Sequence, residues 1–203
     1  MEQNGQIIRF ARGKYARLDK GNLKVEYSYE PSELMKQIED AVAKQFPLVN
    51  FQVWELIQWN EFVNHQIAHN AIFVEVEYGL SDYVFDFLKE KYENVMLKPD
   101  KESYYRYMSD NMIVIQQLVS GAPAPLKGTK QASIEKMLVD LFSRKLTGSF
   151  IEHAEYPHIL EDAFQKYRIN ESSMFRYARR RNLEKLIKEY IDENTDIRLE
   201  TGK

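Results

Sequence analysis

Four arginines gather late in this sequence, in the segment FRYARRRN at residues 175–182. A helical periodicity that turns Met174 and Ala178 inward would place basic side chains on an exposed stripe. Guanidinium groups bind phosphate oxygens through paired hydrogen bonds, and an aromatic ring among them can stack on a base. We therefore expect contact with nucleic acid or with the acidic face of a protein partner, and simple solvation of a surface helix is the alternative. The expected contact residues are Arg176, Tyr177, Arg179, Arg180 and Arg181.

The residues around this stripe have the rhythm of a helix-turn-helix. One helix ends before a short turn at residues 168–170, and a second helix opens with Asn170 as its cap. The second helix of such a motif presents polar groups at its first turn, and Glu171, Ser172 and Ser173 occupy that turn here. This pattern is compatible with DNA binding without specifying it.

A second group of basic residues lies near the start of the chain. The stretch IIRFARGKYARL carries a turn signal at Arg12-Gly13, which predicts a two-stranded ribbon over residues 5–18. An isolated hairpin is only marginally stable in water, so we expect this one to dock on something. The basic residues expected on its rim to make contacts are Arg9, Arg12 and Lys14.

Two histidines and two glutamates form an alternative candidate site. His65 and His69 stand four apart in a stretch predicted to be helical, and Glu75 and Glu77 follow on one face of the next strand. The sequence lacks the general base of an HExxH motif, because Gln66 occupies that position. These four residues leave open a metal-dependent phosphodiesterase or nucleotidyltransferase-like enzyme, whereas ordinary structural histidines are the simpler interpretation.

Composition limits the function classes further. The chain of 203 residues is 44% hydrophobic, which favours a packed core, and its formal net charge of −3 argues against wholesale coating of nucleic acid or anionic membrane. With no cysteine, disulfides, thiolate metal sites and cysteine nucleophiles are excluded. The sequence contains no apolar run of membrane-spanning length and no apolar signal-peptide stretch at its start. We expect a cytoplasmic protein without a cofactor and without a membrane partner.

The elements that must position these residues predict an α+β fold. Strands and helices alternate over residues 31–122, which indicates a central mixed sheet of four or five strands flanked by helices. An N-terminal β-hairpin precedes the sheet, and a helical C-terminal subdomain follows it. The stretch SGAPAPLKGTK at residues 120–130 is the clearest boundary. The expected regions are a β-rich wing-like segment at 1–30, the sheet domain at 31–122, the helical subdomain at 131–193 and a polar tail at 194–203.

Three finer predictions can be compared directly with the structure. The apolar spacing predicts a helix over residues 55–69 and alternating strand structure over 23–29. The helix that opens at Asn170 is expected to continue through Tyr190. Ser32, Ser133 and Asn170 are expected to cap helices.

Several short blocks together resemble a known family. They are GQIIRFARGKY near the start, WNEFVNHQ and AIFVEVE in the middle, IEKMLVDL after residue 130, and YRINESSMFRYARRRN late. The combination resembles bacterial proteins related to the antitoxin of AbiE-type abortive-infection toxin–antitoxin systems. The resemblance implies a winged-helix DNA-binding domain followed by an α/β domain, and a protein that represses its own operon and neutralises a nucleotidyltransferase-like toxin without requiring a stable complex.

The same resemblance makes residues 5–17 the wing of a winged helix. Because the chain begins at Met1 a few residues before this wing, we expect the winged helix to be largely missing from it. The resemblance applies to the basic hairpin and to the fold of the second domain, and it implies no catalytic residues in this chain. The expected function is therefore that of a non-catalytic, antitoxin-like or transcriptional-regulator-like binding protein. Its expected partners are its own operator DNA and a nucleotidyltransferase-like toxin, and its oligomeric state is left open.

Overall fold

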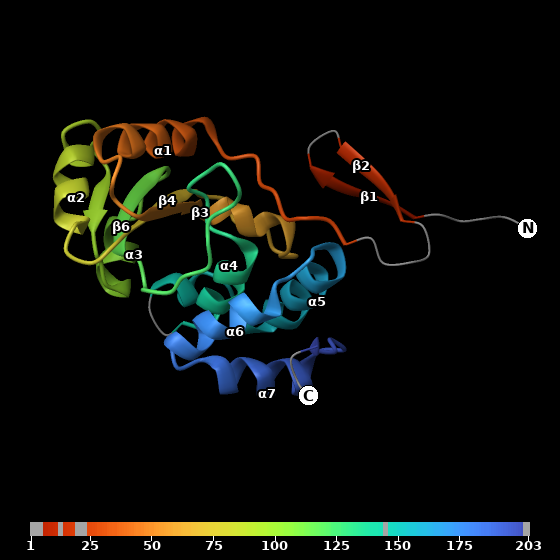
Figure 1. The fold of residues 1–203 in the computed structure, drawn as a ribbon. Helices are drawn as coiled ribbons and strands as arrows, with labels where there is room; N and C mark the ends of the chain where they lie inside the picture. The colour runs from red at the N-terminus through yellow and green to blue at the C-terminus, as the bar shows by residue number, and fades with distance from the viewer. Residues whose placement is uncertain (1–5, 12–13, 19–23, 144–145, 201–203) are drawn as a thin grey trace, which may run out of the picture.

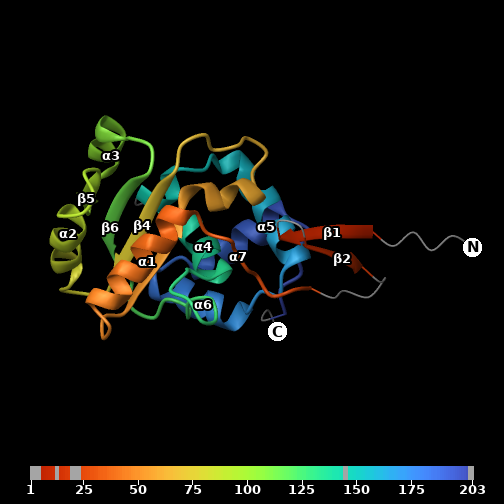
Figure 2. The ribbon, with the colours of Figure 1, turned by 90° about the horizontal axis from the view of Figure 1, so that it is seen from above.

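A four-stranded mixed sheet forms the centre of the protein. The structure is a computed structural model that describes residues 6–11, 14–18, 24–143 and 146–200. The sheet has the order β3-β4-β6-β5, with β3 antiparallel to β4 and the other neighbours parallel. Figure 2 shows β5, β6 and β4 following one another across the sheet. The strands are β3 (Phe51–Glu55), β4 (Ala71–Val76), β5 (Val95–Leu97) and β6 (Met112–Gln117). The α+β class predicted from the sequence is confirmed.

Two helices cover one face of the sheet, α1 (Glu33–Gln45) and α2 (Ser81–Lys89) (Figure 1). The hydroxyl of Ser32 accepts a hydrogen bond from the backbone N–H of Met35 at 3.2 Å, so the predicted cap of α1 is confirmed. Both strand faces are buried in β4, as the continuous apolar run AIFV predicts for a central strand.

The other face carries the remaining helices, which share one hydrophobic core with the sheet. Ser133 caps α4 and Asn170 caps α6, each accepting from a backbone N–H in the first turn, as predicted. Trp54 stacks on Phe73 in this core, with ring centroids 4.1 Å apart. The helices are α3 (Lys101–Tyr107), α4 (Ile134–Leu141), α5 (Tyr156–Lys166), α6 (Glu171–Arg180) and α7 (Glu184–Asn194), together with the short 3-10 helices η2 (Leu146–Ser149) and η3 (His153–Glu155).

The Pro- and Gly-rich stretch after β6 protects the free edge of β3. The backbone N–H of Val53 donates to Lys130 O at 2.8 Å, and the N–H of Ala132 donates to Val53 O at 2.9 Å. An uncovered edge strand exposes unpaired backbone N–H and C=O groups that can pair with the strands of other chains, and this bridge occupies two of those groups.

The helix predicted over residues 55–69 is wrong beyond its first turns. The structure has only a short 3-10 helix there, η1 (Leu56–Glu61), and residues 62–70 form no helix. Asparagine side chains explain the difference. Asn60 Oδ1 accepts from Ile67 N at 2.7 Å, and its Nδ2 donates to Ile67 O at 3.0 Å. Asn70 Oδ1 accepts from Ile57 N at 3.3 Å. These bonds satisfy backbone groups outside a helix.

The other two finer predictions also need correction. Residues 24–30 run extended but pair only at Val25, which bridges to Tyr167 because helix α5 ends there and frees its backbone. The last helix does not continue from Asn170 through Tyr190, because the chain turns between α6 and α7 at Asn182, whose φ is 57°.

At the N-terminal end the backbone of the predicted ribbon is present. Strands β1 (Gln6–Ala11) and β2 (Lys14–Leu18) pair antiparallel in a sheet of their own. Over the described residues, none of the helices is both long and apolar enough to cross a membrane.

Candidate functional site

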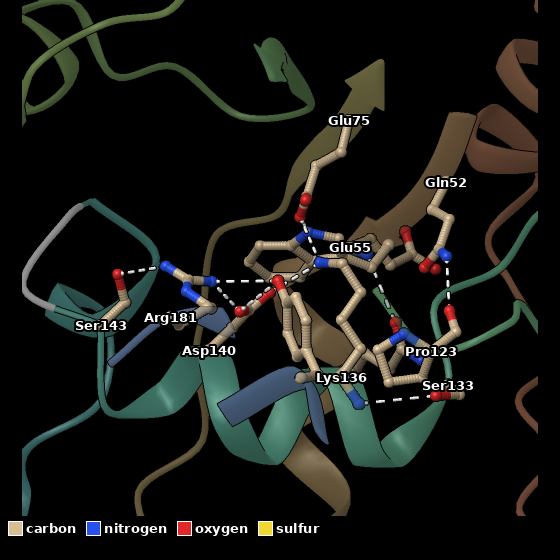
Figure 3. Close-up of polar contacts among 12 residues, drawn as sticks. Gln52, Glu55, Glu75, Pro123, Ser133, Lys136, Asp140, Ser143 and Arg181 are labelled. Atoms are coloured by element: carbon tan, nitrogen blue, oxygen red, sulfur yellow. Dashed lines mark hydrogen bonds and ion pairs between the residues drawn. The ribbon is translucent and has the colours of Figure 1, made fainter. Parts of the chain in front are cut away.

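A buried lysine joins α4 to the sheet. Lys136 is 1% exposed, and its ammonium donates to Glu75 Oε1 and to Asp140 Oδ2 at 2.6 Å each. Trp54 Nε1 donates to the same Glu75 oxygen at 2.8 Å. Glu75 comes from β4, whereas Asp140 lies one turn beyond Lys136 on α4 (Figure 3). These bonds fix the helix on the sheet through side chains that are almost fully buried.

Helix α6 and the residue after it complete this cluster. Tyr177 OH donates to Asp140 Oδ1 at 3.0 Å, and Arg181 contacts the same oxygen. Arg181 Nη2 also donates to Ser143 Oγ at 2.7 Å. Two carboxylates thus face two cations, and buried charges are tolerated when they are paired and hydrogen-bonded in this way. We call this cluster the Lys136 network; its members are Trp54, Glu75, Lys136, Asp140, Ser143, Tyr177 and Arg181.

The opposite charges of the network stabilise one another's charged forms. Burial disfavours the ammonium of Lys136, but the carboxylates of Asp140 and Glu75 outweigh burial and raise its pKa. Arg181 follows the same pattern: burial opposes its charge, and Asp140 raises its pKa. Burial and then the charge of Asp140 raise the pKa of the Tyr177 hydroxyl. Because a lysine nucleophile or base needs a free amine, a lysine held as ammonium is poorly suited to either role.

Two adjoining cavities open beside the network, at the carboxyl ends of β4 and β6. Their volumes are about 460 and about 550 Å³. Members of the Lys136 network line the first cavity, Arg180 lines the second, and Gln117 and Val119 belong to both. We call the pair the carboxyl-edge cleft. In open α/β sheets, ligands bind outside the carboxyl ends of parallel strands, so this is the place where the fold offers a binding site.

The four late arginines have different surroundings. Arg179 binds both carboxylate oxygens of Glu184, at 2.7 and 2.9 Å, and Arg181 is 10% exposed within the Lys136 network. Arg176 and Arg180 are exposed, and each donates to a serine hydroxyl, at 3.5 and 3.0 Å. Within the described ranges, neither of these two guanidinium groups forms an ion pair with a carboxylate. Arg176 and Arg180 therefore present uncompensated positive charge.

Tyr177 corrects one expectation about this segment. Its side chain is fully buried and its hydroxyl is bound to Asp140, so the ring is not on the exposed stripe and cannot stack on a base. The period of 3.6 residues explains this position, because residue 177 lies on the same side of the helix as the buried Met174 and Ala178. The exposed stripe itself, with Arg176, is present as predicted.

The basic hairpin residues are only partly described. Arg9 lies in β1 and Lys14 in β2, but their side chains are outside the described residues, as is the whole of Arg12. Their predicted contacts therefore stay predictions.

The alternative metal ligands do not come together. His65 Nδ1 contacts Glu155 Oε1 at 2.8 Å, whereas Glu75 belongs to the Lys136 network. Glu77 points to the same face as Glu75 but accepts from Asn50 N at 2.8 Å in the second cavity. His65 and His69 share no helix. In the part of the chain that the structure describes, no three His, Asp or Glu side chains could hold a metal ion together.

Four residues of the network, Trp54, Lys136, Asp140 and Ser143, were not predicted as site residues from the sequence. A sequence signal exists for Lys136 and Asp140. They stand four apart inside the otherwise apolar run IEKMLVDL, so they share one face of a helix predicted to be buried. Charged side chains are rarely fully buried unless paired, and the partner Glu75 had been considered only as an alternative metal ligand.

Comparison with known proteins adds one finding. No curated protein and no solved structure matches this chain. A family model matches residues 1–197, which includes the hairpin, the sheet and all the helices described above. The chain therefore belongs to DUF6577, a family of unknown function.

Proposed function

We propose that this protein is a non-catalytic, antitoxin-like regulator that binds nucleic acid through the exposed arginines of α6. Its partners would be the operator DNA of its own gene and a nucleotidyltransferase-like toxin, both in the cytoplasm. The basic hairpin residues Arg9, Arg12 and Lys14 would form a second contact surface.

One observation carries this proposal. In a chain of net charge −3, Arg176 and Arg180 stand one helical turn apart with no carboxylate partner in the described ranges. The neighbouring Arg179, by contrast, is paired with Glu184. Two uncompensated guanidinium groups at this spacing can bind successive phosphate oxygens.

The state of the buried lysine removes Lys136 as a candidate nucleophile or base. The raised pKa of Lys136 keeps it charged, and its carboxylate neighbours are already hydrogen-bonded. An activated nucleophile would need the opposite shift.

The test is a fluorescence-anisotropy titration with duplex DNA from the region upstream of the gene, beside a scrambled duplex, at two salt concentrations. We expect tight, salt-sensitive binding that prefers the native sequence. The double variant Arg176→Ala/Arg180→Ala should bind more weakly, and its slope of log K against log salt should fall by about 0.9 for each phosphate that the variant no longer neutralises. Both side chains are exposed, so the free energy of unfolding should change by less than about 0.5 kcal/mol.

A matched control removes the same charge elsewhere. Lys44 on α1 and Arg106 on α3 are exposed, and Lys44→Ala/Arg106→Ala should bind DNA like the wild type. Equal binding by the Arg176→Ala/Arg180→Ala variant would contradict the proposed surface. If the wild type binds no duplex, the DNA part of the proposal is wrong, and a pull-down with the neighbouring gene product would then test the toxin partner.

A further inference from the structure

A residue in the wall of the second cavity of the carboxyl-edge cleft carries a buried acceptor that has no donor among the described residues. Gln52 on β3 is 2% exposed and lies in the cavity wall. Its Nε2 donates to Pro123 O at 2.7 Å, which fixes the amide orientation (Figure 3). Its Oε1 accepts no hydrogen bond from the described residues. A buried acceptor left unpaired is costly, so this position favours a ligand that brings an N–H group.

The rim of the same cavity offers the other contacts that a nucleotide needs. Tyr78 is 84% exposed and lies in the cavity wall. A free ring at the mouth of a polar cavity is a platform on which a base can stack. Arg180 lies in the wall, held through Nε by the hydroxyl of Ser120 at 3.0 Å, which leaves its terminal nitrogens available to a phosphate.

The polar groups of the wall also bear on which base the cavity would accept. Glu77 lies in the wall as a second acceptor near the sheet edge, with one oxygen bound to Asn50 N at 2.8 Å. The carbonyl of Gln52 and this carboxylate can accept from an exocyclic amino group, as in cytosine, whereas uracil presents the acceptor O4 at that position. Uracil keeps one donor on this edge, N3–H, so the preference for cytosine rests on the contact at position 4. The cavity volume of about 550 Å³ is within the range of small-molecule sites.

We infer that this cavity binds an unstacked nucleotide whose base carries an exocyclic amino group. The base lies on Tyr78 and donates to Gln52, and the phosphate binds Arg180. The nucleotide can be free or can be an unpaired unit of a nucleic acid, since both present the same base and phosphate. The inference extends the proposed function, because Arg180 serves both.

Isothermal titration of the full chain with CMP, UMP, cytidine and a short single-stranded oligocytidylate tests this inference. We expect CMP to bind about tenfold more tightly than UMP, which lacks the exocyclic amino group, and about tenfold more tightly than cytidine, which lacks the phosphate. Tyr78→Ala should weaken CMP binding by about tenfold, as expected when a base loses its stacking platform. Tyr83→Ala is the matched control, because Tyr83 is an exposed tyrosine on α2 outside the cavity wall, and it should bind CMP like the wild type.

The oligocytidylate identifies the source of the nucleotide. Tighter binding of the oligonucleotide than of CMP, abolished by Tyr78→Ala, assigns the site to single-stranded nucleic acid, and equal or weaker binding assigns it to a free nucleotide. Gln52→Leu should bring the affinities for CMP and UMP close together. If that buried variant does not fold, the ratio of the CMP and UMP affinities of the wild type and the CMP affinity of Tyr78→Ala still test the inference.

Absence of saturable binding by CMP and the oligonucleotide at millimolar concentration would overturn the inference, and so would binding unaffected by Tyr78→Ala. If Tyr78→Ala still binds duplex DNA while CMP does not bind, the inferred nucleotide site would be overturned and the proposed function would stand.

Discussion

At the scale of single residues, Lys136 has the largest expected effect on stability. Replacing it by methionine would leave Glu75 buried beside an apolar side chain, and the indole of Trp54 would be its one remaining donor among the described residues. Removing one partner of a buried ion pair costs about 3–5 kcal/mol. We expect Lys136→Met to lower the free energy of unfolding by that amount in urea denaturation.

The double variant Lys136→Met/Glu75→Gln provides the control for this effect. It removes the unpaired charge and should recover at least about 1 kcal/mol relative to Lys136→Met. The exposed Lys185 on α7 is a reference site, and Lys185→Met should change stability by less than about 0.5 kcal/mol. A Lys136→Met protein as stable as the wild type would contradict the prediction, because it would show that removing Lys136 leaves no costly unpaired charge on Glu75.

His65 carries a second residue-scale prediction. Its hydrogen bond to Glu155, and then the charge of that carboxylate, raise the pKa of the imidazole above its ordinary value of 6.5. Because the folded pKa exceeds the unfolded one, the pair stabilises fully below pH 6.5, and this contribution is lost as the pH rises through the folded pKa. NMR titration should show the raised pKa in the wild type and a return toward 6.5 in Glu155→Gln. Glu77→Gln should leave it unchanged, and an equal pKa in Glu155→Gln would refute the assignment.

At the scale of elements, the turn between α6 and α7 places the arginines. Asn182 adopts φ of 57°, its N–H donates to Arg179 O at 3.0 Å, and Leu183 N–H donates to Ala178 O at 2.8 Å. This is the paired bonding of a Schellman motif, which ends a helix with a left-handed residue. The turn sends Arg181 back toward the network while Arg180 stays at the cleft.

The conformation of Asn182 can be tested by substitution. Asn182→Ala should cost about 1 kcal/mol, because alanine is strained in the left-handed region, whereas Asn182→Gly should be as stable as the wild type or more so. Urea denaturation of both variants gives the comparison. Equal stability of the alanine and glycine variants would mean that residue 182 is not left-handed.

At the scale of the whole molecule, buried tyrosines set the alkaline limit of stability. Burial raises the pKa of Tyr104 and of Tyr156 to about 12, and it also raises the pKa of Tyr27, Tyr167 and Tyr177. The unfolded chain releases these protons near pH 10, whereas the folded chain keeps them, so the unfolded state binds fewer protons above pH 10 and stability falls with rising pH.

The predicted result is coupled unfolding and ionisation. Tyrosinate absorbance and loss of circular dichroism should rise together above pH 10 as one cooperative step. Tyr83 and Tyr107 are exposed, so Tyr83→Phe or Tyr107→Phe should reduce the early, non-cooperative part of the absorbance change without moving the unfolding step. Complete tyrosine ionisation in a chain that keeps its circular dichroism would contradict the prediction.

Local sequence signals predicted most of the elements and little of the site. The caps Ser32, Ser133 and Asn170 were identified because each bonds to a backbone N–H three residues away, which is information held in one turn of chain. The prediction of a helix over residues 55–69 was wrong because the spacing of apolar residues gives no information about asparagine side chains that hydrogen-bond to backbone groups.

The sequence by itself determined the α+β class, the order of the elements and the exposure of Arg176, because hydrophobic periodicity decides which side of each helix or strand is buried. Only the tertiary structure decided the Lys136 network. Glu75 is 61 residues from Lys136, and Asp140 is 41 residues from Arg181. No local pattern encodes such pairings, because the charges are tolerated in the core only when packing brings both partners to the same place.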